Sequence, residues 1–185
     1  MWELANRADP FCCDVADRHY SRQKIGSPQF VPPGRCHVLK RETEDGGKAV
    51  WVTSWPFAQY VKHAWAGAWV NSFFRNEGAG LSSELILSAI IETQLIWEPP
   101  PLGMITFVCP KRVPPTTIRG AKMWGYCYQK AGFKHVGFTK GGLWAWQMLP
   151  HEMPAIPSIS AAKSTATTPT PMDRSLLYEI LADLL

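Results

Sequence analysis

The stretch that decides the fold is AWAGAWVNSFFRNEGAGLSSELILSAIIETQL, residues 64–95. Its first part, residues 64–75, is mostly apolar and aromatic, which predicts a β-strand. Gly78 and Gly80 then predict a tight turn, because glycine adopts backbone conformations that other residues avoid. In residues 81–95 apolar side chains recur at helical spacing, with Ser82 or Ser83 as the expected N-terminal cap. The stretch therefore predicts a strand, a glycine turn and a helix.

Further elements are expected on both sides of this stretch. Prolines and glycines divide the rest of the chain into segments with helical or strand-like patterns. We expect a helix near 11–22, strands at 36–42 and 49–56 joined by a turn at 45–47, a strand at 103–110, a helix at 118–131, and a closing hairpin of strands at 133–139 and 143–149. The order β-β-β-α-β-α-β-β predicts an α/β fold with a mixed, mainly antiparallel sheet flanked by helices.

Length and composition indicate one globular domain. The chain has 185 residues, of which 46% are hydrophobic and 18% charged, a mixture that buries a core and excludes wholesale disorder. No apolar run approaches the ~20 residues needed to span a bilayer, and the first residues lack the pattern of a signal peptide. The five cysteines form no C-x-x-C pair, which argues against a thiolate zinc site and a disulfide framework. We therefore expect a cytoplasmic protein.

The composition changes near residue 150. Residues 151–172 are rich in proline, serine, threonine and alanine, which predicts a linker. In residues 173–185 leucine and isoleucine recur at helical spacing, which predicts a short amphipathic helix. Such a helix docks on its own domain or mediates self-association or partner binding. The expected organisation is a domain at 1–150, a linker at 151–172 and a helix at 173–185.

The net charge is +4, from 19 Lys and Arg against 15 Asp and Glu. A basic excess suits a phosphate-bearing partner, and three basic segments, 18–24, 111–112 and 119–122, are candidates for contacting backbone phosphates. Ordinary solvated surface charge explains the same numbers. The charge alone leaves both interpretations open.

The turn in the quoted stretch is a candidate anion site. The motif Arg75-x-x-Gly78-x-Gly80 lies where the strand ends and the helix begins, and its glycines let a ligand approach the backbone. Free N–H groups and the helix dipole at such a position favour a pyrophosphate. A tight turn without a ligand explains the pattern equally well. The candidate cofactor-binding residues are Arg75, Asn76, Glu77, Gly78, Gly80, Ser82 and Ser83.

A second motif, Tyr128-x-Lys130-x-Gly132-Phe133, places a tyrosine near the expected end of a helix. Its hydroxyl is neutral at pH 7 and can donate a proton to a leaving group. The alternative is a structural tyrosine at the edge of the core.

Together, the two motifs resemble the GNAT superfamily of N-acyltransferases over residues 34–149. The resemblance implies that the first motif binds the pyrophosphate of acyl-coenzyme A. It also implies that Tyr128 acts as a general acid toward the leaving thiolate.

A further resemblance concerns Asp17-Arg18-His19-Tyr20-Ser21, taken with residues 74–77 and 82–85. These segments are similar to the Mom-type DNA-modification enzymes of bacteriophages, a divergent branch of the superfamily. The resemblance implies an anti-restriction enzyme, acting in the host cytoplasm, that transfers an acyl- or aminoacyl-derived group to the N6 amine of adenine in DNA. His19 would then be the catalytic base or positioning group, supported by Tyr20 and Ser21. A hydrogen-bonded structural histidine is the alternative.

Donor, metal and acceptor stay open at this point. The donor is acetyl-coenzyme A or an aminoacyl-tRNA, and iron is implied only by the family resemblance. Four of the nine tryptophans lie on or beside the expected strands: Trp51, Trp55, Trp65 and Trp69. Most of these four are expected in the core, and some can stack on an extruded base. The alternatives are an ordinary N-acetyltransferase acting on a small amine or a protein, and an inactive binding module.

Overall fold

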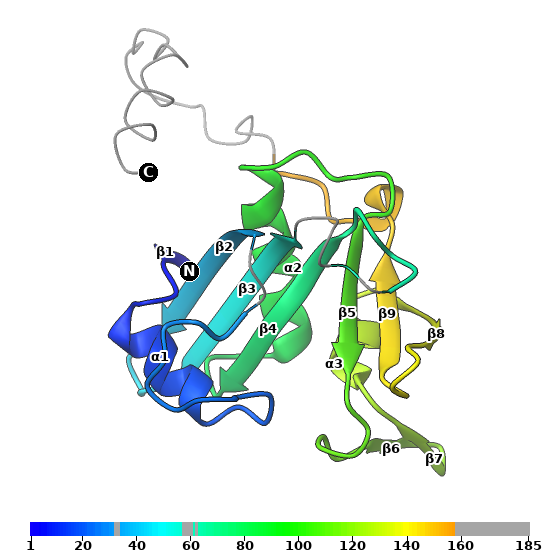
Figure 1. Ribbon diagram of the computed structural model, residues 1–185, viewed down its shortest axis with the longest axis horizontal. Helices are drawn as coiled ribbons and strands as arrows, with labels where there is room; N and C mark the ends of the chain where they lie inside the picture. The colour runs from blue at the N-terminus through cyan, green and yellow to red at the C-terminus, as the bar shows by residue number, and fades with distance from the viewer. Residues whose placement is uncertain (32–33, 57–60, 62, 158–185) are drawn as a thin grey trace, which may run out of the picture.

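The computed structural model describes residues 1–31, 34–56, 61 and 63–157. They form a mixed α/β fold around a seven-stranded, mainly antiparallel sheet in the order β1-β2-β3-β4-β5-β9-β8 (Figure 1). The strands of this sheet are β1 Glu3–Ala5, β2 Gly34–Glu42, β3 Lys48–Pro56, β4 Trp69–Glu77, β5 Met104–Val108, β8 Lys134–Phe138 and β9 Trp144–Met148. A separate hairpin pairs β6 Thr116–Ile118 with β7 Ala121–Met123, and the helices are α1 Pro10–Asp17, α2 Ser82–Gln94 and α3 Tyr126–Lys130, followed by a 3-10 turn Pro150–Glu152.

The one parallel pair of the described sheet joins β4 to β5, and it is short. Residues 69–71 pair with residues 104–106, and beyond them the strands diverge (Figure 1). In the adjacent ladder Val52 pairs with Phe73 and Thr53 with Asn71, so Ser72 is the extra residue of a β-bulge. A bulge bends its strand and re-aims nearby side chains. The bend and the divergence open the sheet between β4 and β5.

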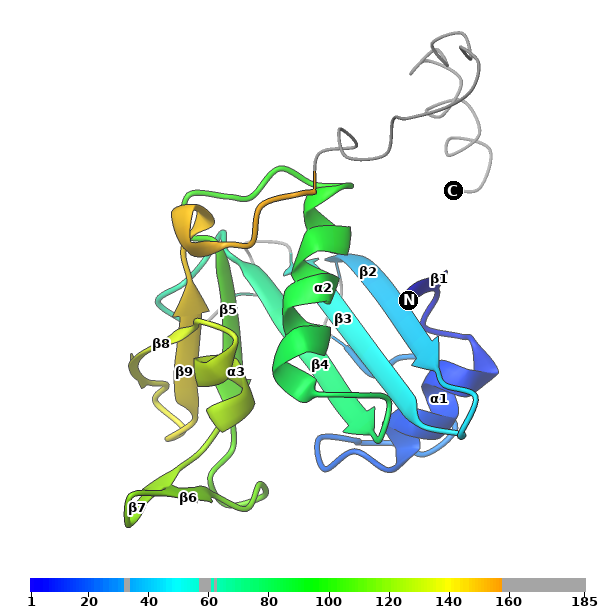
Figure 2. The same ribbon diagram turned by 180° about the vertical axis from the view of Figure 1, so that it is seen from behind.

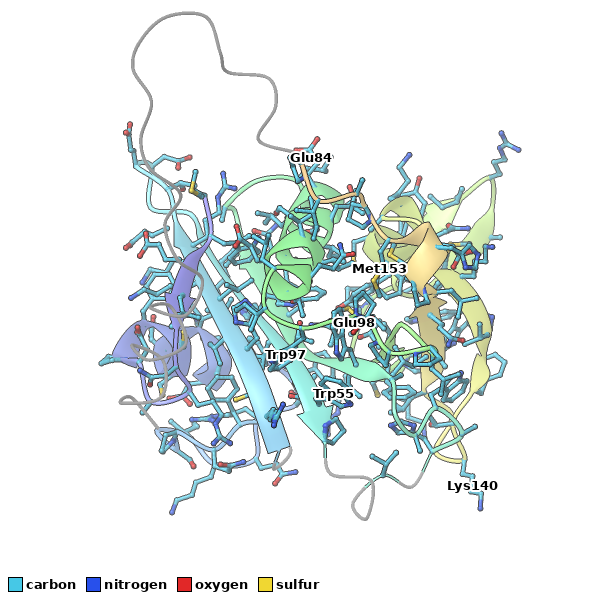
Figure 3. The ribbon with its side chains drawn as sticks, turned by 90° about the horizontal axis from the view of Figure 1, so that it is seen from above. Trp55, Glu84, Trp97, Glu98, Lys140 and Met153 are labelled. Atoms are coloured by element: carbon cyan, nitrogen blue, oxygen red, sulfur yellow. The ribbon has the colours of Figure 1, made fainter. Side chains whose placement is uncertain are left out.

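Helices cover both faces of the sheet. α1 packs on one face, and α2 lies along the other, as the opposite views show (Figures 1 and 2). The core beneath α2 includes Trp51 and Trp69, both fully buried, which confirms the expectation for these two tryptophans. Trp55 and Trp97 pack at its margin with ring centroids 6.0 Å apart (Figure 3).

Core contacts continue beyond residue 150. Met153 is buried in the same core, and the carbonyl of Pro154 accepts a hydrogen bond from Gln94. The helix expected at 173–185 and most of the expected linker lie outside the described residues.

Most elements match the sequence expectations, and three do not. The expected helix at 118–131 is wrong: Arg119 and Gly120 have φ of 47° and 81° and turn the chain into the β6–β7 hairpin. Gly125, at φ 80°, then starts the short α3, so only the last part of the expected range is helical. The first helix ends at Asp17 rather than near residue 22, and β4 begins at Trp69 rather than residue 64.

The early end of α1 has a physical cause. The carboxylate of Asp17 accepts hydrogen bonds from the Arg22 guanidinium and from the N–H of Gly26, which hold the following residues in a loop.

The expected cap at Ser82 or Ser83 is also wrong, since α2 has Leu81 at its N-cap without a side-chain cap. None of the helices in the described residues is long and apolar enough to cross a membrane.

Candidate active site

A cavity of about 160 Å³ lies where β4 and β5 diverge. Strand residues form its floor, α3 forms one wall, and the loop after α1 forms the opposite wall. We call it the tyrosine cavity. It is lined by His19, Tyr20, Asn71, Ser72, Phe73, Phe74, Thr106, Phe107, Val108, Val113, Gly125, Cys127 and Tyr128.

A buried hydrogen-bond network ties Tyr128 to both strands. Its hydroxyl donates to Asn71 Oδ1 at 2.6 Å, and the hydroxyl of Thr106 lies 3.3 Å from the same oxygen. The Asn71 amide donates to the carbonyls of Val52 and Phe73 at 3.2 and 2.9 Å. Because buried polar groups are costly unless they are paired, this network fixes the position of the tyrosine hydroxyl.

Local geometry explains why α3 presents Tyr128 to the cavity. The left-handed Gly125 begins the helix where a Cβ would lie 2.7 Å from the Trp146 indole nitrogen, so glycine is required. The Tyr128 ring packs edge-on against Phe133 and Phe74, at centroid distances of 5.4 and 6.4 Å. Burial raises the pKa of Tyr128 well above 10, so its hydroxyl keeps its proton throughout the neutral range.

Across the cavity, His19 lies in the loop after α1. Its ring packs against Tyr20 and Phe73 at centroid distances of 4.2 and 4.7 Å. Ser21 supplies the polar contacts: its Oγ lies 2.7 Å from His19 Nδ1, and its backbone N–H donates to the same nitrogen at 3.2 Å. Burial, assisted by the nearby Arg75, lowers the pKa of His19 to about 4, so the ring is neutral at pH 7.

The contacts of Ser21 also select a tautomer. A backbone N–H can only donate, so the arrangement favours a His19 ring with a bare Nδ1 and a proton on Nε2. That ring offers a hydrogen-bond donor to a substrate. Service as a base at Nε2 requires the other tautomer, with Nδ1–H donating to Ser21 Oγ.

The glycine turn lies beside a second hollow, the arginine cleft, of about 470 Å³. This cleft shares His19, Tyr20, Phe74 and Val113 with the tyrosine cavity, and its other lining residues are Asp17, Arg18, Arg75, Asn76, Ser82, Arg112 and Pro114. A ligand lying in both hollows would run from the start of α2 to Tyr128.

Asn76 holds the turn together. Its amide donates to the Gly80 carbonyl at 2.8 Å and to Ser82 Oγ at 2.9 Å, while its oxygen accepts from the N–H of Ala79. Gly78 and Gly80 have φ of 86° and 132°, values that favour glycine. Ser83 is half-buried in the first turn of α2.

The charges at this turn largely cancel. Glu77 accepts hydrogen bonds from Arg75 and Arg18, and Arg18 also pairs with Asp14. Hydrogen bonds from the two guanidinium groups, with that of Arg18 contributing most, lower the pKa of Glu77 to about 2. Glu77 therefore holds two arginine side chains in place and is not positioned as a ligand group. Arg112, which is exposed, brings a further cation to the cleft.

The described residues do not fit an iron site. They contain no group of three or more His, Cys, Asp or Glu side chains close enough to hold a metal ion. His19 Nδ1 faces Ser21, and its ring neighbours are aromatic. The iron implied by the family resemblance therefore has no place in the chemistry derived below.

The structure brings six of the expected site residues to two adjoining hollows, whereas Glu77, Gly78, Gly80 and Ser83 do not line them. His19, Tyr20 and Tyr128 line the tyrosine cavity, whereas Arg75, Asn76 and Ser82 line the arginine cleft. Ser21 lines a third hollow of about 630 Å³ and reaches the site through His19.

The sequence expectations missed Asn71 and Thr106. Asn71 is a polar residue in the otherwise apolar start of β4, and such an interruption was the one available signal of a buried hydrogen-bonded group.

Searches with the whole chain against protein-family models, curated proteins and solved structures found no match.

Proposed function

We propose that this protein is a GNAT-type acyltransferase that moves an acyl group from a phosphate-bearing thioester donor to an amine. The observation that carries the proposal is the buried Tyr128 hydroxyl, which lies at the cavity between two diverging parallel strands and donates a hydrogen bond to Asn71 Oδ1 at 2.6 Å. A proton donor held there is suited to a departing anion.

The surroundings of the tyrosine support a phosphate-bearing donor. The glycine turn and the uncapped start of α2 adjoin the arginine cleft, where backbone N–H groups and the helix dipole favour an anion. Since Glu77 neutralises Arg75 and Arg18, we assign most of the phosphate binding to the backbone and to Arg112.

The reaction follows from these positions. The amine nitrogen forms a bond to the thioester carbonyl carbon, the C–S bond breaks, and the sulfur departs as a thiolate. Tyr128 turns its hydroxyl proton from Asn71 Oδ1 to the sulfur, donates it there and regains one from solvent. The amine loses a proton to His19 in its Nε2-basic tautomer or to water, while Ser21 holds the ring.

For the acceptor, we propose the N6 amine of adenine in DNA, on the Mom-type resemblance of residues 17–21 and 74–77 and the basic charge. An aminoacyl-tRNA is then the second candidate donor, with an ester C–O bond broken in place of C–S. The alternative acceptor is a small amine, which the tyrosine cavity of about 160 Å³ also admits.

The proposal is tested by supplying acetyl-coenzyme A and measuring thiol release with simple amines, oligonucleotides and adenine-containing DNA. In parallel, DNA from cells expressing the chain is digested and its nucleoside masses are compared with those of an empty-vector control. We expect thiol release that depends on Tyr128, and a shifted adenine mass if DNA is the acceptor. Acylation of small amines with unchanged adenine establishes the ordinary N-acetyltransferase.

Donor binding is measured by calorimetry on the wild type and on Tyr128→Phe. Tight donor binding without turnover toward any acceptor identifies an inactive binding module and overturns the enzyme proposal.

A further inference from the structure

Positive charge is distributed very unevenly along this chain. Residues 1–98 contain 10 Lys and Arg against 11 Asp and Glu. Residues 99–151 contain seven Lys and Arg and no acidic residue. The basic excess of the protein therefore originates in the segment that forms β5 to β9 and α3.

All seven basic residues of this segment are exposed: Lys111, Arg112, Arg119, Lys122, Lys130, Lys134 and Lys140. Among the described residues, Lys134 is the one of the seven that pairs with a carboxylate, that of Glu152. In the first half of the chain, by contrast, Arg18, Arg22 and Arg75 are held by acidic side chains. Six cations of residues 99–151 thus have no carboxylate partner within the part of the chain that the structure describes.

The same region exposes aromatic rings. Trp144 on β9 is the centre of a cluster, with ring centroids 4.5 Å from His135, 5.5 Å from Phe138 and 5.5 Å from Trp124. Phe138 is 59% exposed and His135 is exposed, while Trp124 and Trp144 are half-buried. We call these four residues the aromatic surface. Contiguous exposed apolar patches on a protein surface mark interaction sites.

Two segments that carry basic residues lie next to the aromatic surface. The β6–β7 hairpin, with Arg119 and Lys122, lies beyond the β8–β9 turn that contains Lys140 (Figures 1 and 2). Trp124, at the root of this hairpin, contacts Trp144, and Lys140 extends outward at the edge of the molecule (Figure 3).

We propose that the aromatic surface and its bordering cations bind single-stranded nucleic acid, with unpaired bases stacked on Phe138 and Trp144 and phosphates held by Arg119, Lys122 and Lys140. An exposed aromatic ring beside cations that have no carboxylate partner among the described residues suits an unpaired strand, since stacking suits any base and the cations follow the backbone. A purely apolar partner would leave the cations unmatched. A duplex would leave the rings uncovered.

This binding does not depend on the acyltransferase proposal, because neither Phe138 nor Lys140 lines the tyrosine cavity or the arginine cleft. The surface adjoins that site through Trp124, whose indole donates to the carbonyl of Val113, a residue that lines both hollows. A strand on this surface would pass close to the tyrosine cavity.

The test is fluorescence anisotropy of a labelled oligothymidylate of about 20 nucleotides with the full chain, against a duplex of equal length. We expect the single strand to bind more tightly. Phe138→Ala should weaken it roughly 5- to 100-fold, whereas Phe138→Tyr should change it less than ~3-fold, because a tyrosine ring still stacks. Ile25→Ala, at a side chain that is 78% exposed elsewhere, is the matched control.

Salt dependence separates the charge contribution. The double variant Lys122→Ala/Lys140→Ala should reduce the slope of log K against log salt by about 1.4, and Arg35→Ala, at an exposed cation outside the three basic segments, should leave it unchanged. Tighter binding of the duplex, indifference to Phe138→Ala in a folded variant, or an effect of Arg35→Ala as large as that of the double variant would each overturn the proposal.

Discussion

The two walls of the tyrosine cavity are built in opposite ways. Tyr128 is 7% exposed, and Asn71 links its hydroxyl to backbone carbonyls of β3 and β4. His19 lies in a loop, half-buried, and its polar contacts come from Ser21, two residues away. One wall is therefore fixed by long-range buried hydrogen bonds, whereas the polar contacts of the other are local. Under the proposed mechanism, the difference suits a preorganised proton donor that faces a less tightly held histidine.

The largest expected effect is a loss of turnover at the wall that carries Tyr128. Tyr128→Phe should lower turnover ~10²–10⁴-fold while leaving the fold and donor binding intact, because the proton donor alone is lost. Stopped-flow or thiol-release kinetics measure turnover, and circular dichroism checks the fold. Near wild-type turnover would remove Tyr128 from the mechanism.

The second effect concerns the residue that positions Tyr128. Asn71→Ala deprives the carbonyls of Val52 and Phe73 and the Tyr128 hydroxyl of a partner. At ~1 kcal/mol for each hydrogen bond, the free energy of unfolding should fall by ~2–3 kcal/mol, as measured by urea titration. Ser72→Ala, at the neighbouring bulge, is the control and should change stability less. Equal losses in both variants would show that the network does not fix the wall.

A third effect appears at acid pH. The pKa of His19 is about 4 in the folded chain against 6.5 for the free residue, and buried His37 also has a pKa of about 4. The unfolded chain then binds more protons between these values, so the free energy of unfolding should fall as pH is lowered from 6.5 toward 4. His37, 5% exposed, should account for up to about 3 kcal/mol.

Glu77 does not obscure this effect at pH 5.0 and above. The pKa of Glu77 is lowered to about 2, so its contribution is present above pH 4.5 and is lost below it. Urea titrations at pH 7.0, 6.0 and 5.0 on the wild type, His19→Gln and His37→Gln separate the two histidines. A pH-independent wild type would show that neither ring is held neutral by burial.

The smallest effect on turnover is expected at the wall that carries His19. Ser21→Ala removes the hydroxyl beside His19 Nδ1 but keeps the backbone N–H contact. We expect the acid limb of the kcat/KM profile to shift by less than ~1 pH unit and turnover to fall less than ~10-fold, since one local hydrogen bond is lost. A loss as large as that of Tyr128→Phe would mean that both walls are equally fixed.

Local patterns predicted much of the fold. The glycine turn, α2, the β2–β3 hairpin and the β8–β9 hairpin all follow from periodicity and from turn residues close in sequence. The same reasoning wrongly predicted a helix over residues 118–131, because Gly120 and Gly125 take left-handed conformations that interrupt a helical pattern. The three-residue β1 carries too little pattern to be recognised and depends on pairing with β2.

By itself the sequence determined the strand–turn–helix unit and identified Tyr128, His19 and Arg75 as candidates, because short-range sterics and spacing are local properties. The tertiary structure alone decided their environments. Asn71 meets Tyr128 across 57 residues, and Arg18 reaches Glu77 across 59. Such contacts depend on the path of the whole chain and on the cost of leaving buried polar groups unpaired, which no local pattern records.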